Sequence, residues 1–158
     1  MNVSSWQCGM HCHGLFHFNP QKKKGIQAMY QINEKSKAIM EVLIAQLDDG
    51  YLKLNNASGI FMPLVMEKVT DEPGFTAVYS LAHYGKQNGD LMADPEMTFG
   101  ECDHEFYPLS FRNDYVGVYQ EVIGEQVNLK RQKELAEFTA IWLMEIVEQQ
   151  KLIIQQGD

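Results

Sequence analysis

Apolar and polar residues alternate along the middle of the chain, and this pattern predicts a β-sheet. Phe75 to Tyr84 carries apolar or aromatic side chains on both faces of an extended chain, which is typical of a central strand. Asn88-Gly89 predicts a turn, because both residues tolerate a positive φ. Asp94-Pro95 predicts a second break, since the residue before a proline is restricted. Tyr107 to Phe111 and Tyr115 to Ile123 flank a short polar turn, so they predict a hairpin.

A second hairpin and two helices complete the predicted fold. Tyr51 to Leu54 and Ile60 to Val69 predict the hairpin. Asn33 to Asp48 has apolar residues at helical spacing, with Asn33 as the N-cap. Leu129 to about Gln155 repeats the helical spacing over a longer stretch. We therefore expect an α+β fold, in which an antiparallel sheet of about five strands is flanked by an N-terminal helix and a long C-terminal helix.

Length and composition favour one globular domain. The chain has 158 residues, of which we expect residues 29–158 to form the domain. Residues 1–28 show no hydrophobic period, so we expect them to be a disordered tail. The formal charge of −8 disfavours direct binding to nucleic acid or to anionic membranes. The chain shows no membrane-spanning run and no signal-peptide pattern, and its three cysteines suit a reducing compartment, so we expect a cytoplasmic protein.

The N-terminal tail also contains candidate metal ligands. Cys8, Cys12 and His17 could bind zinc as thiolates and an imidazole. They lie within ten residues of one another, whereas a structural zinc site usually takes two separated pairs of ligands. We therefore expect no metal centre and no cofactor, and a zinc titration of the full chain would test these three residues.

Carboxylates concentrate in the middle of the chain, and three interpretations of them are open. Asp90, Asp94 and Glu96 could ligate Mg²⁺ or Ca²⁺ through hard oxygen atoms. The acidic residues could instead form a surface that imitates a phosphate backbone and occupies a basic cleft. They could also be present only because turns favour Asp and Asn. The candidate interaction surface comprises Asp90, Asp94, Glu96, Asp103, Arg112, Asp114 and Tyr115.

Two strings in the same region carry a resemblance to a known family, namely YSLAHYGKQNGDLMADPEM and YPLSFRNDYVGVYQEV. They resemble a family of small domains of unknown function that are encoded on bacterial plasmids, conjugative elements and phages. Some copies of these domains lie within large polyvalent proteins. The resemblance covers roughly Asn33 to Val122. It implies an accessory protein of a mobile genetic element that acts against host defence, and it implies no catalytic residues.

These observations predict a small, non-enzymatic binding protein of a mobile genetic element. Its acidic surface would bind a basic cleft of a protein partner, as an anti-restriction or anti-CRISPR protein would. The C-terminal helix, about 40 Å long at 1.5 Å per residue, either covers the sheet or overhangs it and forms a homodimer. The alternative is a divalent-metal-dependent hydrolase or nuclease-like enzyme that uses the carboxylates of Asp90, Asp94 and Asp114.

Overall fold

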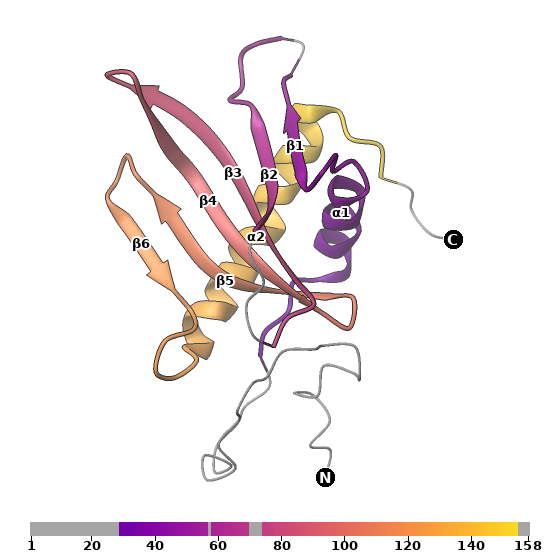
Figure 1. The fold of residues 1–158 in the computed structure, drawn as a ribbon, viewed down its shortest axis with the longest axis vertical. Coiled ribbons are helices and arrows are strands. Elements are labelled where there is room, and N and C mark those ends of the chain that lie inside the picture. The colour runs from indigo at the N-terminus through magenta and orange to yellow at the C-terminus, as the bar shows by residue number, and fades with distance from the viewer. Residues whose placement is uncertain (1–28, 57, 70–73, 155–158) are drawn as a thin grey trace, which may run out of the picture.

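The computed structural model describes residues 29–56, 58–69 and 74–154, which form one antiparallel sheet and two helices (Figure 1). Each of the six strands pairs with the next one in the sequence, so the sheet order is β1–β2–β3–β4–β5–β6. The strands are β1 (Tyr51–Leu54), β2 (Leu64–Val69), β3 (Ala77–Gln87), β4 (Asp90–Cys102), β5 (Glu105–Asn113) and β6 (Val118–Glu121). The helices are α1 (Glu34–Ile44) and α2 (Leu129–Gln150).

The predicted α+β fold with an N-terminal helix and a long C-terminal helix is therefore confirmed, although the sheet has six strands where about five were expected. Asn33 caps α1 as predicted, because its side chain accepts a hydrogen bond from the Ser36 amide at 2.8 Å. Both helices end earlier than their apolar spacing suggests. Residues 1–28, the predicted tail, lie outside the described residues.

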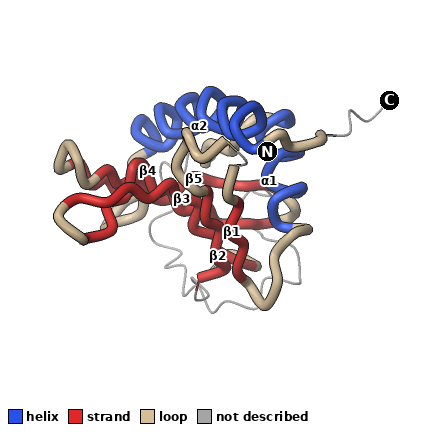
Figure 2. The backbone as a smooth tube through the Cα atoms, turned by 90° about the horizontal axis from the view of Figure 1, so that it is seen from above, coloured by secondary structure: helices blue, strands red, loops and turns tan. Residues whose placement is uncertain are grey.

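Both helices pack on the same face of the sheet, as Figure 2 shows. The core between them contains the central strand residues Leu81 and Phe99 and the α2 residues Trp142 and Leu143, all nearly or fully buried. Burial of such side chains is the main contribution to the stability of the fold. No described helix is long and apolar enough to cross a membrane.

No described helix covers the opposite face of the sheet, and its side chains are polar near the centre. Ser80 donates a hydrogen bond to Glu96 at 2.8 Å across β3 and β4. The hydroxyls of Thr98 and Ser110 lie 2.6 Å apart across β4 and β5. These cross-strand pairs satisfy polar groups on this face without contact with a helix.

A bulge interrupts the pairing of β3 and β4. Ala82 pairs with Glu96, but Tyr84 pairs with Ala93, so Asp94 and Pro95 together stand opposite His83. The expected break at Asp94-Pro95 is therefore wrong, because β4 continues through both residues. A bulge accommodates proline, which has no N–H to donate to the ladder, and it redirects the neighbouring side chains.

Candidate functional site

The tips of the β3–β4 and β5–β6 hairpins lie side by side. We call this region, residues 85–96 and 112–121, the hairpin end. The amide of Asp114 donates to the carbonyl of Ala93 at 2.9 Å, and the carboxylate of Asp114 accepts from the amide of Ala93 at 2.8 Å. Both tips extend past α2 in the view of Figure 2. The hydrogen bonds therefore hold two segments far apart in the sequence in one surface.

An ion-pair cluster stabilises the hairpin end. The guanidinium of Arg112 donates two hydrogen bonds, of 2.6 and 3.0 Å, to the carboxylate of Asp114. It also lies 3.8 Å from the carboxylate of Glu96. The hydrogen bond from Arg112 and the one from the Ala93 amide both lower the pKa of Asp114. Asp114 is therefore a residue that holds the two hairpins together.

The structure brings most of the predicted surface residues together. Asp90 is exposed at the tip of the β3–β4 hairpin. Tyr115 packs on Gly85, where an added Cβ would meet the tyrosine hydroxyl. Asp103 lies at the other end of β4, in the turn to β5, so it does not belong to this region. The predicted residues within the hairpin end are Asp90, Asp94, Glu96, Arg112, Asp114 and Tyr115.

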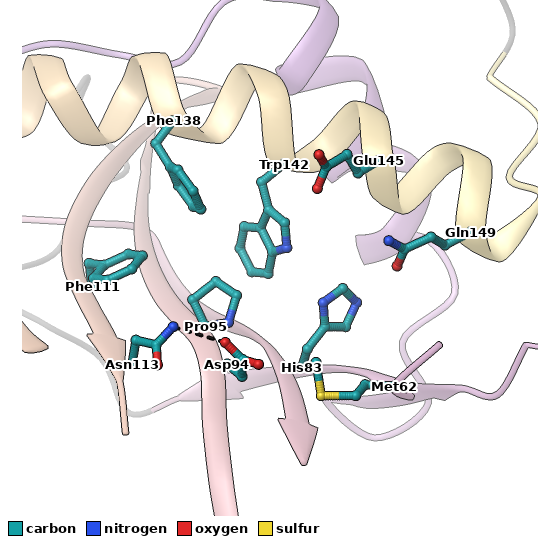
Figure 3. Close-up of a pocket in the computed structure, with 10 residues that line it drawn as sticks. All are labelled: Met62, His83, Asp94, Pro95, Phe111, Asn113, Phe138, Trp142, Glu145 and Gln149. Atoms are coloured by element: carbon teal, nitrogen blue, oxygen red, sulfur yellow. Dashed lines mark hydrogen bonds between the residues drawn. The ribbon is translucent and has the colours of Figure 1, made fainter. Parts of the chain in front are cut away.

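A pocket lies between α2 and the bulge of the sheet, on the helix-covered face (Figure 3). Its volume is about 360 Å³. We call it the His83 pocket. Its lining comprises Met62, His83, Asp94, Pro95, Phe111, Asn113, Phe138, Trp142, Glu145 and Gln149.

Aromatic rings form one wall of the His83 pocket. The rings of Phe138 and Trp142 stack with centroids 6.0 Å apart, because four residues make about one turn of α2. Phe111 of β5 meets the ring of Phe138 edge-on at 5.4 Å. His83 meets the ring of Trp142 edge-on at 5.7 Å. These ring contacts join α2, β5 and β3 in one continuous aromatic wall.

His83 is a polar residue in a buried position. It is only 5% exposed, and its Nε2 atom has no hydrogen-bond partner. Burial lowers the pKa of His83 below its ordinary value of 6.5, and the nearby carboxylate of Asp94 offsets only part of that effect. The imidazole is therefore neutral at pH 7. A buried ring nitrogen without a hydrogen-bond partner is uncommon, so this position is a candidate for hydrogen bonding to a ligand.

Two carboxylates complete the lining of the His83 pocket. Asp94 is half-buried at the bulge, and the side-chain amide of Asn113 donates to its Oδ1 atom at 2.9 Å. Glu145 is exposed on α2, at the mouth of the pocket. Figure 3 shows Glu145 and Gln149 on α2 facing His83 and Asp94 on the sheet. The lining contains no lysine or arginine.

Of the residues that line the pocket, only Asp94 belongs to the site predicted from the sequence. His83 gives a sequence signal that could have been used. It is the one titratable imidazole on a strand face that otherwise carries Ala77, Tyr79 and Leu81. Its connection with Trp142 has no such signal, because the two residues are 59 positions apart and meet only in the folded chain.

The structure brings no metal ligands together within the part of the chain that it describes. There, no three His, Cys, Asp or Glu side chains are grouped so that they could hold an ion. Asp94 lines the His83 pocket, Asp90 lies at the hairpin tip, and Asp114 binds Arg112. Cys8, Cys12 and His17 lie outside the described residues. The hydrolase alternative stays a prediction.

Comparison with known proteins identifies the family but no function. Neither curated proteins nor solved structures give a match to the chain. A family model described as Domain of unknown function (DUF6908) matches residues 25–152, which include every described helix and strand. Because this match covers most of the chain, the protein belongs to the DUF6908 family.

Proposed function

We propose that the protein is a small, non-enzymatic binding protein whose hairpin end docks into a basic cleft of another protein. The observation that carries the proposal is the composition of the hairpin end. This region contains five carboxylates and two cations, a net charge of −3. Leu91 and Val116 lie among these charges, and their side chains are 63% and 68% exposed. Each tip therefore offers one exposed apolar side chain among charges, which supports contact with a protein partner.

The setting that we propose is a mobile genetic element, with a component of host defence in the cytoplasm as the partner. The resemblance of the two central strings to domains carried by plasmids, conjugative elements and phages supports this setting. A defence protein that handles nucleic acid has a basic cleft for phosphates. An acidic and partly apolar projection would compete for such a cleft.

The experiment compares two triple variants that make the same change in charge and that each replace two exposed apolar residues by serine. The first, Asp90→Lys with Leu91→Ser and Val116→Ser, alters the hairpin end. The control, Glu134→Lys with Ile141→Ser and Ile153→Ser, alters exposed positions on and after α2. Each protein is used to capture partners from lysates of bacteria that carry defence systems. Captured proteins are identified and then purified for binding measurements.

We expect a basic protein that the wild type and the control triple capture and that the hairpin-end triple does not. Its association rate should fall as the salt concentration rises, because charges at a rim act mainly on the rate of encounter. Equal capture by the two triples would show that the hairpin end is not the docking surface. A salt-independent association rate would contradict the electrostatic part of the proposal.

A further inference from the structure

The His83 pocket shares Asp94, Pro95 and Asn113 with the hairpin end, but it opens on the helix-covered face and has a different chemical character. Its wall is apolar and aromatic, and its polar groups are mainly acceptors. The carboxylates of Asp94 and Glu145 carry two negative charges, and no lysine or arginine in the lining balances them. Neither carboxylate forms an ion pair among the described residues. The pocket is therefore electronegative at neutral pH.

The unpaired nitrogen of His83 is an independent indication of a ligand. The side chain is more than nine-tenths buried, lines the pocket, and leaves Nε2 without a partner. In a neutral imidazole one ring nitrogen accepts a hydrogen bond and the other donates one. A ligand with N–H groups would supply the partner that the protein does not.

The aromatic wall favours a positive charge over a neutral group. The rings of Phe111, Phe138 and Trp142 are arranged around the pocket (Figure 3), and the faces of such rings attract cations. A guanidinium is planar, stacks on aromatic rings and pairs with carboxylates through two hydrogen bonds. An anion would meet two carboxylates, and a purely apolar ligand would leave the charge of Asp94 without a cation and Nε2 of His83 without a hydrogen-bond partner.

The volume limits the size of the ligand. At about 360 Å³ the pocket is at the small end of ligand sites, so it fits a group of amino-acid side-chain size. We propose that the His83 pocket binds an organic cation, a guanidinium or ammonium group on an apolar stem. Asp94 and Glu145 neutralise its charge, His83 accepts one of its hydrogen bonds, and the aromatic wall packs against its stem. Asp94 belongs both to this pocket and to the hairpin end, but the inference does not depend on the docking of the hairpin end into a partner.

The test uses n-butylguanidinium and n-butylammonium as probes and n-butylurea as a neutral control of similar shape. Binding is measured at constant ionic strength through the fluorescence of Trp142, in a Trp6→Phe background that leaves Trp142 as the sole tryptophan. We expect both cations to bind with saturation, the guanidinium more tightly. Butylurea should bind at least about tenfold more weakly, because it lacks the charge.

Matched variants locate the probe. Glu145→Gln removes the charge at the mouth of the pocket, whereas Glu148→Gln makes the same change at an exposed position of α2 that does not line the pocket. We expect the first to raise the Kd of butylguanidinium about fivefold and the second to leave it unchanged. His83→Phe keeps a ring and removes the nitrogen, so it should weaken binding without lowering the melting temperature.

A Gly-Gly-Arg-Gly-Gly peptide with acetylated and amidated ends distinguishes two sources of the cation, an arginine side chain of another protein and a free small molecule. If the pocket takes an arginine side chain of another protein, this peptide binds at least as tightly as butylguanidinium. If the pocket takes a free small molecule, the peptide binds more weakly, because its backbone does not fit. The proposal is refuted if butylurea equals the cations, if no probe binds at tens of millimolar, or if Glu145→Gln and Glu148→Gln behave alike.

Discussion

Gln132 joins three parts of the chain and offers a sharp test of how the fold is held together. Its side chain, on the first turn of α2, is fully buried. Its Oε1 atom accepts from the Tyr30 amide at 2.7 Å, and its Nε2 atom donates to the Pro108 carbonyl at 3.2 Å. Replacement by leucine, which is similar in size, removes both hydrogen bonds and leaves two backbone groups without these partners.

The cost of Gln132→Leu depends on how deeply each of the two hydrogen bonds is buried. A backbone group that is buried without a partner costs about 1–3 kcal/mol. The contact to Pro108 is buried, so that carbonyl bears most of its cost, whereas the contact to Tyr30 is part-buried and water can replace some of it. The apolar surface of leucine offsets a part of the sum. We expect Gln132→Leu to lower the free energy of unfolding by about 2–4 kcal/mol, which for this chain length lowers the Tm by about 4–16 °C.

Urea and thermal unfolding measure this loss, with Lys133→Leu as the control. That variant introduces the same residue at the next position, which is exposed, so it should change stability by less than about 0.5 kcal/mol. Amide hydrogen exchange at Tyr30 adds a local readout, and the exchange should be faster in Gln132→Leu. If Gln132→Leu is as stable as Lys133→Leu, the two hydrogen bonds of Gln132 contribute nothing to the stability of the fold.

Three further predictions concern the core and the titrating groups. Leu81→Ala, at a fully buried site, should cost about 2–5 kcal/mol in urea unfolding, while Leu91→Ala, which is 63% exposed, should cost less than about 0.5 kcal/mol. Because burial lowers the pKa of His83, the unfolded chain takes up a proton near pH 6.5 that the folded chain does not. The wild type should therefore lose stability relative to His83→Phe as the pH falls below 6.5, and parallel curves would contradict the shift. Burial also raises the pKa of Tyr79 to about 12, so this phenol should titrate about two pH units above an ordinary tyrosine by ultraviolet absorbance. Stability relative to Tyr79→Phe should fall as the pH rises from 10 to 12, and a normal titration would show that Tyr79 is exposed.

The helices and turns could be predicted because their signals are local in the sequence. Asn88 and Gly89 have φ values of 52° and 88°, the positive range that the pair was expected to adopt in the β3–β4 turn. Asn33 caps α1 through a bond that spans three residues. Such features depend on neighbours in the chain, so they are visible before the fold is known.

The pocket could not be predicted, because it depends on register. The alternation of β3 places His83 on a strand face but does not say which residues stand opposite it. The bulge places both Asp94 and Pro95 there, and α2 brings Trp142 over them. Sequence spacing also treats Gln132 as one more polar position on a helix, although its two partners make it part of the core.

Asp94 and Asp114 show why grouping carboxylates by sequence was not enough to define a site. Both are aspartates at the hairpin end, and each lies next to the other hairpin. Arg112 neutralises the charge of Asp114, and the carboxylate also accepts a hydrogen bond from the Ala93 amide. These interactions of Asp114 therefore stabilise the fold. Asp94 receives one neutral amide hydrogen bond from Asn113 and faces a pocket that contains no cation among its lining residues. A half-buried carboxylate without a partner cation is free to pair with a cationic group of a ligand. Of the two aspartates, Asp94 is therefore the one expected to bind a cationic ligand. Asp114 helps to hold the strand that carries Asp94 in position, through its hydrogen bond with Ala93.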